Sequence, residues 1–160
     1  MDDAQNAGVS VYWLGPEFDA GGLHFAVYPE ADFTDDTDSR HPGLSLDYFA
    51  RTAEGSVRSG LEMYSKAGNG PQIMLERALA VDGALADEVQ VGGWPAQLVT
   101  LPSPSRPVNK LYLFVDVGDT VAIVQAASGE TGVPGADPNP LIDKDLLIQV
   151  VAESLQPIPE

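Results

Sequence analysis

The chain of 160 residues contains no cysteine, which excludes disulfide bonds, thiol nucleophiles and cysteine-based zinc sites. A chain of this length buries roughly 70% of the surface that its unfolded form exposes, so it can be stable without a disulfide or a metal. Its 44% apolar and 20% charged residues are typical of a globular protein. We expect a flexible N-terminal linker over residues 1–8 and a single domain over residues 9–160.

Basic residues are scarce: eight Lys and Arg stand against 24 Asp and Glu, which gives a formal net charge of −16. A field of this sign repels phosphate backbones and anionic lipid headgroups, so nucleic acid is not an expected partner. It would favour a basic partner or cations. Because the carboxylates are spread along the chain and form no single block, solubility is the simpler explanation of the charge.

Histidine and motifs of catalysis are almost absent. Only His24 and His41 are present, and no Gly-x-Ser-x-Gly sequence accompanies them, so a hydrolytic triad is not supported. The acidic segment 32–38 offers oxygen ligands for Ca²⁺ but lacks the glycine and final glutamate of an EF-hand loop, and a solvated acidic loop explains it more simply. We predict that the protein is not an enzyme and has no catalytic residue, metal site or cofactor.

Long apolar runs are also missing. No segment reaches the roughly 20 apolar residues of a membrane-spanning helix, and no signal peptide is recognisable. The small, polar start of the chain leads to the hypothesis that Met1 is not the native start and that an export segment precedes it. The beginning of the native full reading frame would test this hypothesis.

The last seventy or so residues carry the clearest structural signal. Residues 88–101 predict two strands about Gly92-Gly93, and residues 111–127 predict a hairpin about Gly118-Asp119. Residues 143–155 predict an amphipathic helix that starts after a cap at Asn139 or Asp143 and is ended by Pro157. Its apolar stripe consists of Leu147, Val150, Val151 and Leu155. This stripe must cover something, and the preceding sheet is the nearest candidate.

The first half of the chain predicts further strands. Residues 9–14 and 23–28 are expected to pair, a polar loop follows over 29–43, and 44–51 alternates again before a turn at 52–60. Residues 61–65 and 72–81 are interpreted as a hairpin. A helix is the alternative for 72–81, because Pro71 suits a first helical turn and apolar residues recur at helical spacing, but strand is favoured. The predicted fold is α+β: a curved antiparallel sheet of about six to eight strands with one C-terminal amphipathic helix packed on it.

Three aromatic residues beside glycine turns are the candidate ligand contacts. Tyr12 and Trp13 precede Gly15-Pro16, and Trp94 follows Gly92-Gly93. Aromatic side chains at such positions can form the floor of a pocket. In a small sheet protein they more often fill the core, and both interpretations stay open.

Two partial resemblances emerge from these segments. The pattern over 88–98, 111–117, 120–125 and 146–155, which ends in Ala152-Glu153-Ser154-Leu155, resembles uncharacterised bacterial extracytoplasmic lipoprotein-like domains and anti-sigma-associated extracellular domains of unknown function. The segment Tyr12-Trp13-Leu14-Gly15 is similar to the opening of small secreted proteins of actinobacteria and Chloroflexi. The resemblances imply export and tethering to the outer face of the cytoplasmic membrane. The chain lacks the lipid-bearing cysteine of such proteins, so an anchor would lie upstream of Met1.

These observations predict a non-catalytic extracytoplasmic domain, the soluble part of a lipoprotein, that binds a protein partner or an apolar small molecule. In the second case the ligand would lie between sheet and helix near Trp13 or Trp94. The alternative is an acidic cytoplasmic protein that neutralises a basic partner, as an immunity protein or nucleic-acid mimic does. Binding that weakens steeply with added salt would distinguish this alternative from a carrier of apolar ligands.

Overall fold

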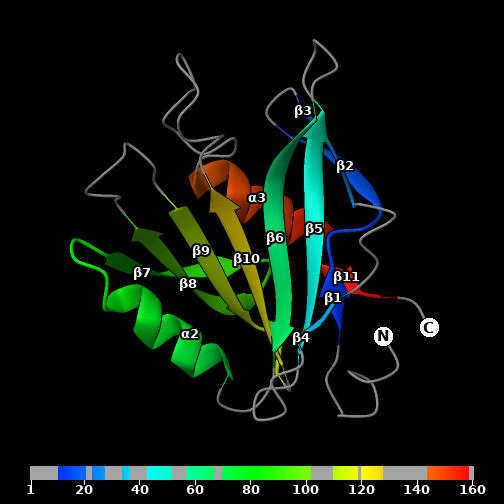
Figure 1. Cartoon of the computed structure of the whole chain (residues 1–160). Helices are drawn as coiled ribbons and strands as arrows, with labels where there is room; N and C mark the ends of the chain where they lie inside the picture. Colours follow the sequence, from blue (N-terminus) through cyan, green and yellow to red (C-terminus); the bar gives the residue numbers. More distant parts are fainter. Residues whose placement is uncertain are drawn as a thin grey trace, which may run out of the picture.

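A single antiparallel sheet dominates the computed structural model, which describes residues 11–20, 23–27, 34–36, 43–51, 57–66, 70–101, 110–118, 120–127 and 144–158. Eight of its nine strands follow one another in the order β2-β3-β5-β6-β10-β9-β8-β7, and β4 pairs with β5 (Figure 1). Their bounds are Glu17–Ala20 (β2), Leu23–Val27 (β3), Thr34–Asp36 (β4), Gly43–Arg51 (β5), Val57–Lys66 (β6), Leu85–Val91 (β7), Trp94–Leu101 (β8), Lys110–Asp116 (β9) and Val121–Ala127 (β10).

A second, smaller sheet joins segments that are distant in the sequence. The strands β1 (Tyr12–Trp13) and β11 (Gln156–Pro157) pair antiparallel, with Tyr12 opposite Pro157. The backbone N–H of Ile158 extends the contact by donating a hydrogen bond to the carbonyl of Val11 at 2.9 Å. The two ends of the described chain therefore lie side by side.

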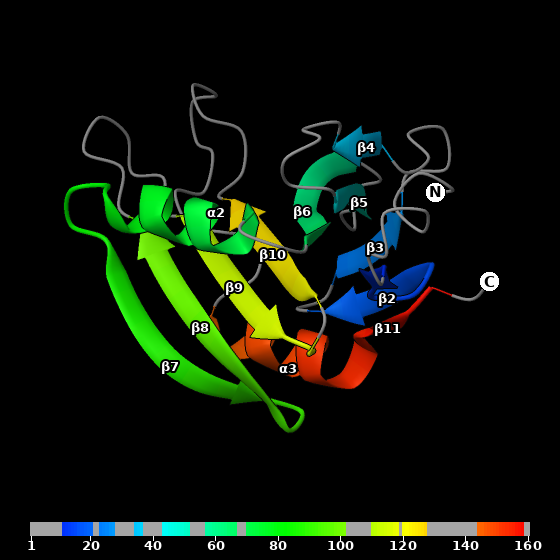
Figure 2. The same cartoon turned by 90° about the horizontal axis from the view of Figure 1, so that it is seen from below.

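The two helices of the described residues cover opposite faces of the main sheet, as Figure 2 shows. Helix α3 (Lys144–Ser154) places Leu147, Val150 and Val151 on the larger hydrophobic core. Helix α2 (Gly70–Leu79) places Ala78 on a smaller cluster formed by Val99, Leu101, Phe114 and Ile123. The alternation of side chains along each strand separates these two cores, because successive residues point to opposite faces.

Several predictions from the sequence are confirmed. The two predicted hairpins are present: β7–β8 turns at Gly92-Gly93 with Val91 opposite Trp94, and the apolar arms β9 and β10 pair with Val121 opposite Asp116. The C-terminal helix is present, and its predicted stripe residues Leu147, Val150, Val151 and Leu155 are all buried. The fold is α+β with a predominantly antiparallel sheet.

The favoured strand over residues 72–81 was wrong, and so was the hairpin with 61–65: the segment forms helix α2. Pro71 lies in the first turn, where its missing N–H costs no helical hydrogen bond. Met74, Leu75 and Ala78 then share one face at helical spacing and pack on the sheet. The exposed Arg77, which interrupted the apolar row of a strand, lies in the last helical turn.

The expected pairing of residues 9–14 with 23–28 was also wrong. Residues between them form strand β2, which pairs with β3, and Phe18 of β2 stacks on Phe25 of β3 with ring centroids 4.9 Å apart. Pro157 was expected only to end the helix, yet it belongs to β11 and pairs with β1. Strand β6 begins at Val57, inside the segment that was expected to be a turn.

Some predictions fall outside the described residues. These are the linker 1–8, His41, the helix caps at Asn139 and Asp143, and all of the acidic segment 32–38 except residues 34–36, which form β4.

Candidate functional site

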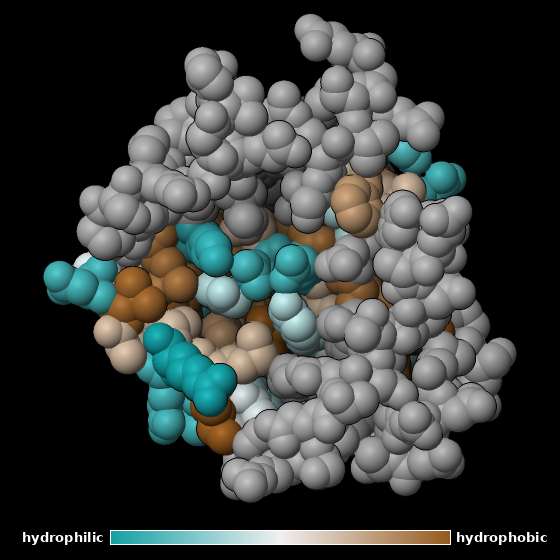
Figure 3. Space-filling model, in the orientation of Figure 1, coloured by the Kyte–Doolittle hydropathy of each residue, from teal (hydrophilic) through white to brown (hydrophobic). Residues whose placement is uncertain are grey.

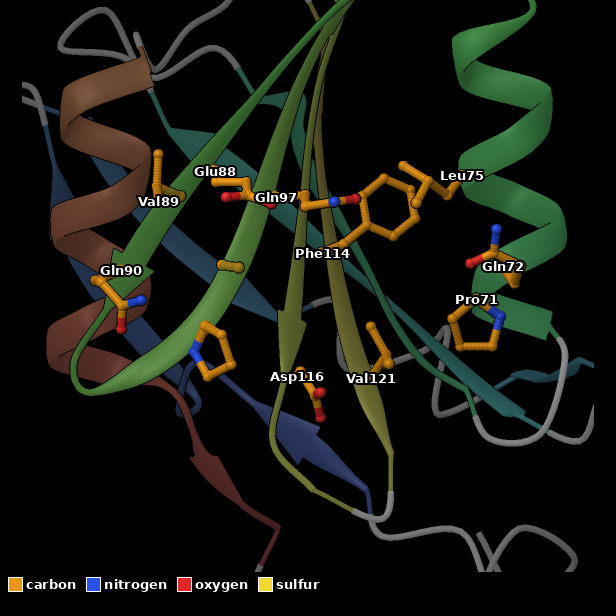
Figure 4. A pocket seen from close by; sticks show the side chains of 12 residues that line it. Pro71, Gln72, Leu75, Glu88, Val89, Gln90, Gln97, Phe114, Asp116 and Val121 are labelled. Atoms are coloured by element: carbon orange, nitrogen blue, oxygen red, sulfur yellow. The ribbon is translucent and has the colours of Figure 1, made fainter.

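An open groove of about 680 Å³ lies between helix α2 and the strands β7 to β10 (Figure 4). It lies on the face of the sheet that α2 covers only in part. A ten-residue helix is about 15 Å long, whereas each of these strands spans seven or eight residues, or about 25 Å. The helix therefore leaves part of each strand uncovered, and the groove occupies that part. Its lining residues are Pro71, Gln72, Leu75, Glu88, Val89, Gln90, Pro95, Ala96, Gln97, Phe114, Asp116 and Val121.

The register of the sheet brings the polar residues of the groove together. Glu88 lies opposite Gln97 across β7 and β8, and Gln97 lies opposite Phe114 across β8 and β9. Cross-strand partners have Cβ atoms about 5 Å apart, so these three side chains form one continuous row. Asp116, opposite Val121, continues the surface toward β10.

The wall formed by α2 is largely apolar. Pro71 and Leu75 face the groove from the helix, and Figure 4 shows Leu75 beside the ring of Phe114. Phe114 is largely buried in the hydrophobic cluster between α2 and the sheet, and it forms part of the groove floor. Gln72 lies at the rim, where its Nε2 donates a hydrogen bond to Oε1 of Glu76 at 3.2 Å.

The groove carries negative charge. Its ionisable lining side chains are the carboxylates of Glu88 and Asp116, and none of the twelve lining residues is Lys, Arg or His. Oδ1 of Asp116 accepts a hydrogen bond from the backbone N–H of Gly118 at 3.0 Å, which fixes this carboxylate at the β9–β10 turn. The groove can therefore hold an apolar group against Leu75 and Val121 and a cationic group against the carboxylates.

A second acidic and aromatic group lies on the same sheet face. The hydroxyl of Tyr64 donates a hydrogen bond to Oε2 of Glu62 at 2.6 Å. Glu62 is opposite Gln125, which in turn is opposite Tyr112. Burial raises the pKa of the Tyr112 hydroxyl, and the negative charge of Glu62 raises it further.

The three aromatic residues predicted from the sequence do not line this groove. Tyr12 and Trp13 form strand β1, and Trp94 begins strand β8. All three are half-buried and pack against the larger core. The backbone N–H of Tyr12 donates a hydrogen bond to Oγ of the buried Ser65 at 3.0 Å, which ties β1 to β6. The indole N–H of Trp13 is buried, and no described group accepts a hydrogen bond from it.

His24 of strand β3 is held by two carboxylates of the neighbouring edge strand β2. Its Nδ1 lies 2.8 Å from Oδ1 of Asp19, and its Nε2 lies 3.4 Å from Oε2 of Glu17. The hydrogen bond with Asp19 is the main cause that raises the pKa of this exposed imidazole. Among the described residues no group of three or more His, Asp or Glu side chains is arranged to hold a metal ion.

The groove was not predicted from the sequence, because one of its walls is helix α2 and this segment was expected to be a strand. The signal that could have been used is the alternation of Glu88, Gln90, Pro95 and Gln97, which share one face of the β7–β8 hairpin. Nothing local to that hairpin indicates that a helix from the preceding segment forms the opposite wall.

Comparison with protein-family models, with curated proteins and with solved structures finds no match to this chain. Within the described part of the chain, neither helix has the length and apolar character needed to cross a membrane.

Proposed function

We propose that the protein is a non-catalytic binding domain whose groove between α2 and strands β7–β10 receives a segment of a protein partner. The observation that carries this proposal is the composition of the groove. Five of its twelve lining residues are Gln72, Glu88, Gln90, Gln97 and Asp116, and the rest are apolar. Pockets for small molecules are predominantly apolar, with a few polar groups that fix orientation. An open groove with five polar side chains beside its apolar wall also suits a peptide segment, which presents amides and mixed side chains.

An apolar small molecule is the other ligand class that this groove can accept. It would lie against Leu75 and Val121 and leave the carboxylates of Glu88 and Asp116 in solvent. Native mass spectrometry of the purified protein distinguishes the two classes. A retained adduct of a few hundred daltons that is lost on denaturation would favour the small molecule.

Site-specific photo-crosslinking tests the protein partner. Replacing Gln97, which lies within the groove, with a photoreactive phenylalanine analogue places the probe where the partner segment would bind. The same replacement at Gln149, exposed on α3 at the opposite sheet face, is the matched control. We expect a discrete crosslinked protein from position 97 in native cells and none from position 149. Equal crosslinking from both positions would contradict the proposal.

We also propose that the domain acts outside the cytoplasm, tethered to the outer face of the membrane by a segment upstream of Met1. The resemblance of the β7–β10 and α3 segments to extracytoplasmic lipoprotein-like domains supports this location. Fractionation of cells that express the native full reading frame tests it, and recovery of the protein in the cytoplasm would contradict it.

Neutralisation of a basic partner is the second candidate function. The net charge of −16 favours it, and so do the twelve described lining residues of the groove, none of which is basic. Exposed charges are largely screened beyond about 10 Å at 0.1 M salt. Partner binding should therefore weaken steeply with added salt if charge provides most of the affinity, and only slightly if the apolar wall does.

A further inference from the structure

The outer edge of strand β7 presents an open row of backbone hydrogen-bonding groups. Within the described residues, β7 pairs only with β8 and ends the main sheet. Residues Leu85 to Glu88 are all exposed, and Leu85 is 66% exposed. An unpaired edge of this length is a template on which another strand can add.

The hairpin turn determines which β7 groups point outward. Val91 and Trp94 are opposite one another across the two-residue turn Gly92-Gly93, in which both glycines have positive φ. The pair that closes such a turn is hydrogen-bonded, and hydrogen-bonded and non-hydrogen-bonded pairs then alternate along an antiparallel ladder. Val89, Asp87 and Leu85 therefore bond to β8, while the N–H and C=O groups of Gln90, Glu88 and Ala86 point outward.

Proline at position 95 agrees with this assignment. Pro95 lies opposite Gln90, a pair that the alternation leaves without hydrogen bonds, and a residue without an N–H is tolerated there. Strand β9 pairs with β8 only from Ala96 onward, so Pro95 leaves no N–H of the β8–β9 ladder missing.

The side chains along this edge combine negative charge with exposed apolar surface. Asp87 and Glu88 are consecutive, so they project from opposite faces of β7, and both are exposed. Leu79, Val81 and Leu85, the exposed large apolar residues of the described chain, gather where α2 ends and β7 begins. Figure 3 shows brown surface in this region, at the left of the view.

We propose that the β7 edge binds an extended basic segment of a protein partner by strand addition, with Lys or Arg side chains beside Glu88 on one face and apolar side chains beside Leu85 on the other. The proposal rests on the proposed function, because Glu88 and Gln90 of β7 also line the groove (Figure 4). Opposite charges across neighbouring strands are favourable, and like charges are not.

A second copy of the chain is a poorer occupant of this edge. Each copy carries a net charge of −16, and charge of this size opposes association of identical molecules. Antiparallel pairing of two β7 strands through these outward groups, centred on Glu88, would also place the two Glu88 carboxylates opposite one another. The charge of the edge therefore selects a basic strand.

Binding of a synthetic peptide of eight alternating Lys and Val residues tests the proposal. We expect calorimetry to detect its binding to the wild-type protein, and amide exchange of Ala86, Glu88 and Gln90 to slow in the complex. The variant Ala86→Pro removes an outward N–H on an edge strand, where proline is compatible with the fold. We expect roughly tenfold or greater loss of affinity, because one interstrand hydrogen bond is lost and the ring obstructs the added strand.

Two variants control for size and charge. Ala86→Val keeps the N–H and should bind the peptide like the wild type, which separates backbone pairing from steric change. Glu88→Gln should weaken binding roughly threefold, whereas Glu153→Gln on α3 should not. A peptide with Glu in place of Lys should bind less tightly than the Lys peptide by at least the effect of Glu88→Gln.

The possible outcomes separate this proposal from the proposed function. Equal binding of the Lys-Val peptide by wild type and Ala86→Pro, with shifts confined to groove residues, would overturn strand addition and leave the groove as the binding site. Absence of peptide binding, or dimerisation of the protein that Ala86→Pro abolishes, would also overturn it. Crosslinking from position 97 tests the proposed function independently, because it does not depend on binding of the Lys-Val peptide.

Discussion

The hydroxyl of Tyr48 donates a hydrogen bond to the backbone carbonyl of Gly15 at 2.8 Å, although the two residues are 33 positions apart in the sequence. The same oxygen accepts a hydrogen bond from the backbone N–H of Leu14 at 2.9 Å. Tyr48 is 0% exposed. A single buried phenol thus pairs with two backbone groups of the connection between β1 and β2, the N–H of Leu14 and the carbonyl of Gly15.

Tyr48→Phe should destabilise the fold by about 1–3 kcal/mol, because it leaves the N–H of Leu14 and the carbonyl of Gly15 without their partner in the core. Tyr112→Phe, at a half-buried position on the other sheet face, is the control and should cost less. Denaturant unfolding of the two variants provides the comparison. A loss at Tyr48 no larger than that at Tyr112 would contradict this role.

The same residue predicts a loss of stability in alkali. Burial raises the pKa of Tyr48 to about 12, against about 10 in the unfolded chain. Above pH 10 the unfolded state loses this proton while the folded state retains it, so stability falls until about pH 12. The difference in unfolding free energy between the wild type and Tyr48→Phe should decrease by about 2–3 kcal/mol over this range. If the difference in unfolding free energy between the two proteins does not change with pH, the pKa of Tyr48 is not raised in the folded state.

The turn glycine Gly92 approaches helix α3 closely. A Cβ at this position would lie 3.2 Å from the backbone oxygen of Ala152, whereas a Cβ at Gly93 would meet nothing within 4 Å. Both residues have positive φ, so alanine strains the backbone at either position. We expect Gly92→Ala to accelerate amide hydrogen exchange in α3 and Gly93→Ala to leave α3 protected. Similar exchange rates of α3 in both variants would show that α3 can shift away from residue 92 without losing stability.

Packing of α3 should account for much of the stability. Leu147 lies on the buried face of α3 and is 0% exposed, whereas Leu85 at the sheet edge is 66% exposed. Leu147→Ala should cost about 2–5 kcal/mol through lost burial and the cavity that remains. Leu85→Ala, the same chemical change at the surface, should cost less than about 0.5 kcal/mol. Thermal or denaturant unfolding measures both, and comparable losses would contradict the core position of α3.

His24 should titrate above its ordinary pKa of about 6.5, because its hydrogen bond with Asp19 favours the charged imidazole. A raised pKa in the folded state means that the contribution to stability is present below the unfolded pKa and is lost as pH rises through the folded one. Asp19→Asn should lower the pKa measured by NMR more than Glu17→Gln does. The reverse order would show that Glu17 is the principal partner.

The features that the sequence predicted correctly are those built from neighbouring residues. The β9–β10 hairpin needs only two apolar arms and a short turn, and the β7–β8 hairpin needs only two strands about Gly92-Gly93, so each signal lies within one stretch of chain. The stripe of α3 is equally local, since Leu147, Val150 and Val151 recur at helical spacing. Periodicity alone therefore sufficed for these elements.

The errors arose where distant partners decide the structure. Strand β1 has only two residues, and it exists because β11 lies beside it, more than 140 positions later. Residues 72–81 contain apolar positions that fit either a strand or a helix, and contact with Val99, Leu101 and Ile123 decides in favour of the helix. The groove depends on that decision, so no local pattern could have predicted it.

The pairing of β1 with β11 also determines how the domain can be attached to anything else. Residues Val11 and Ile158 leave the fold at the same corner, so a flexible extension at either end would hold the domain at one point. In Figure 1 this corner lies at the right, and α2 with the start of β7 lies at the left. A tether at either terminus would therefore present the groove and the β7 edge away from its anchor, and a short loop joining the termini would leave both surfaces accessible.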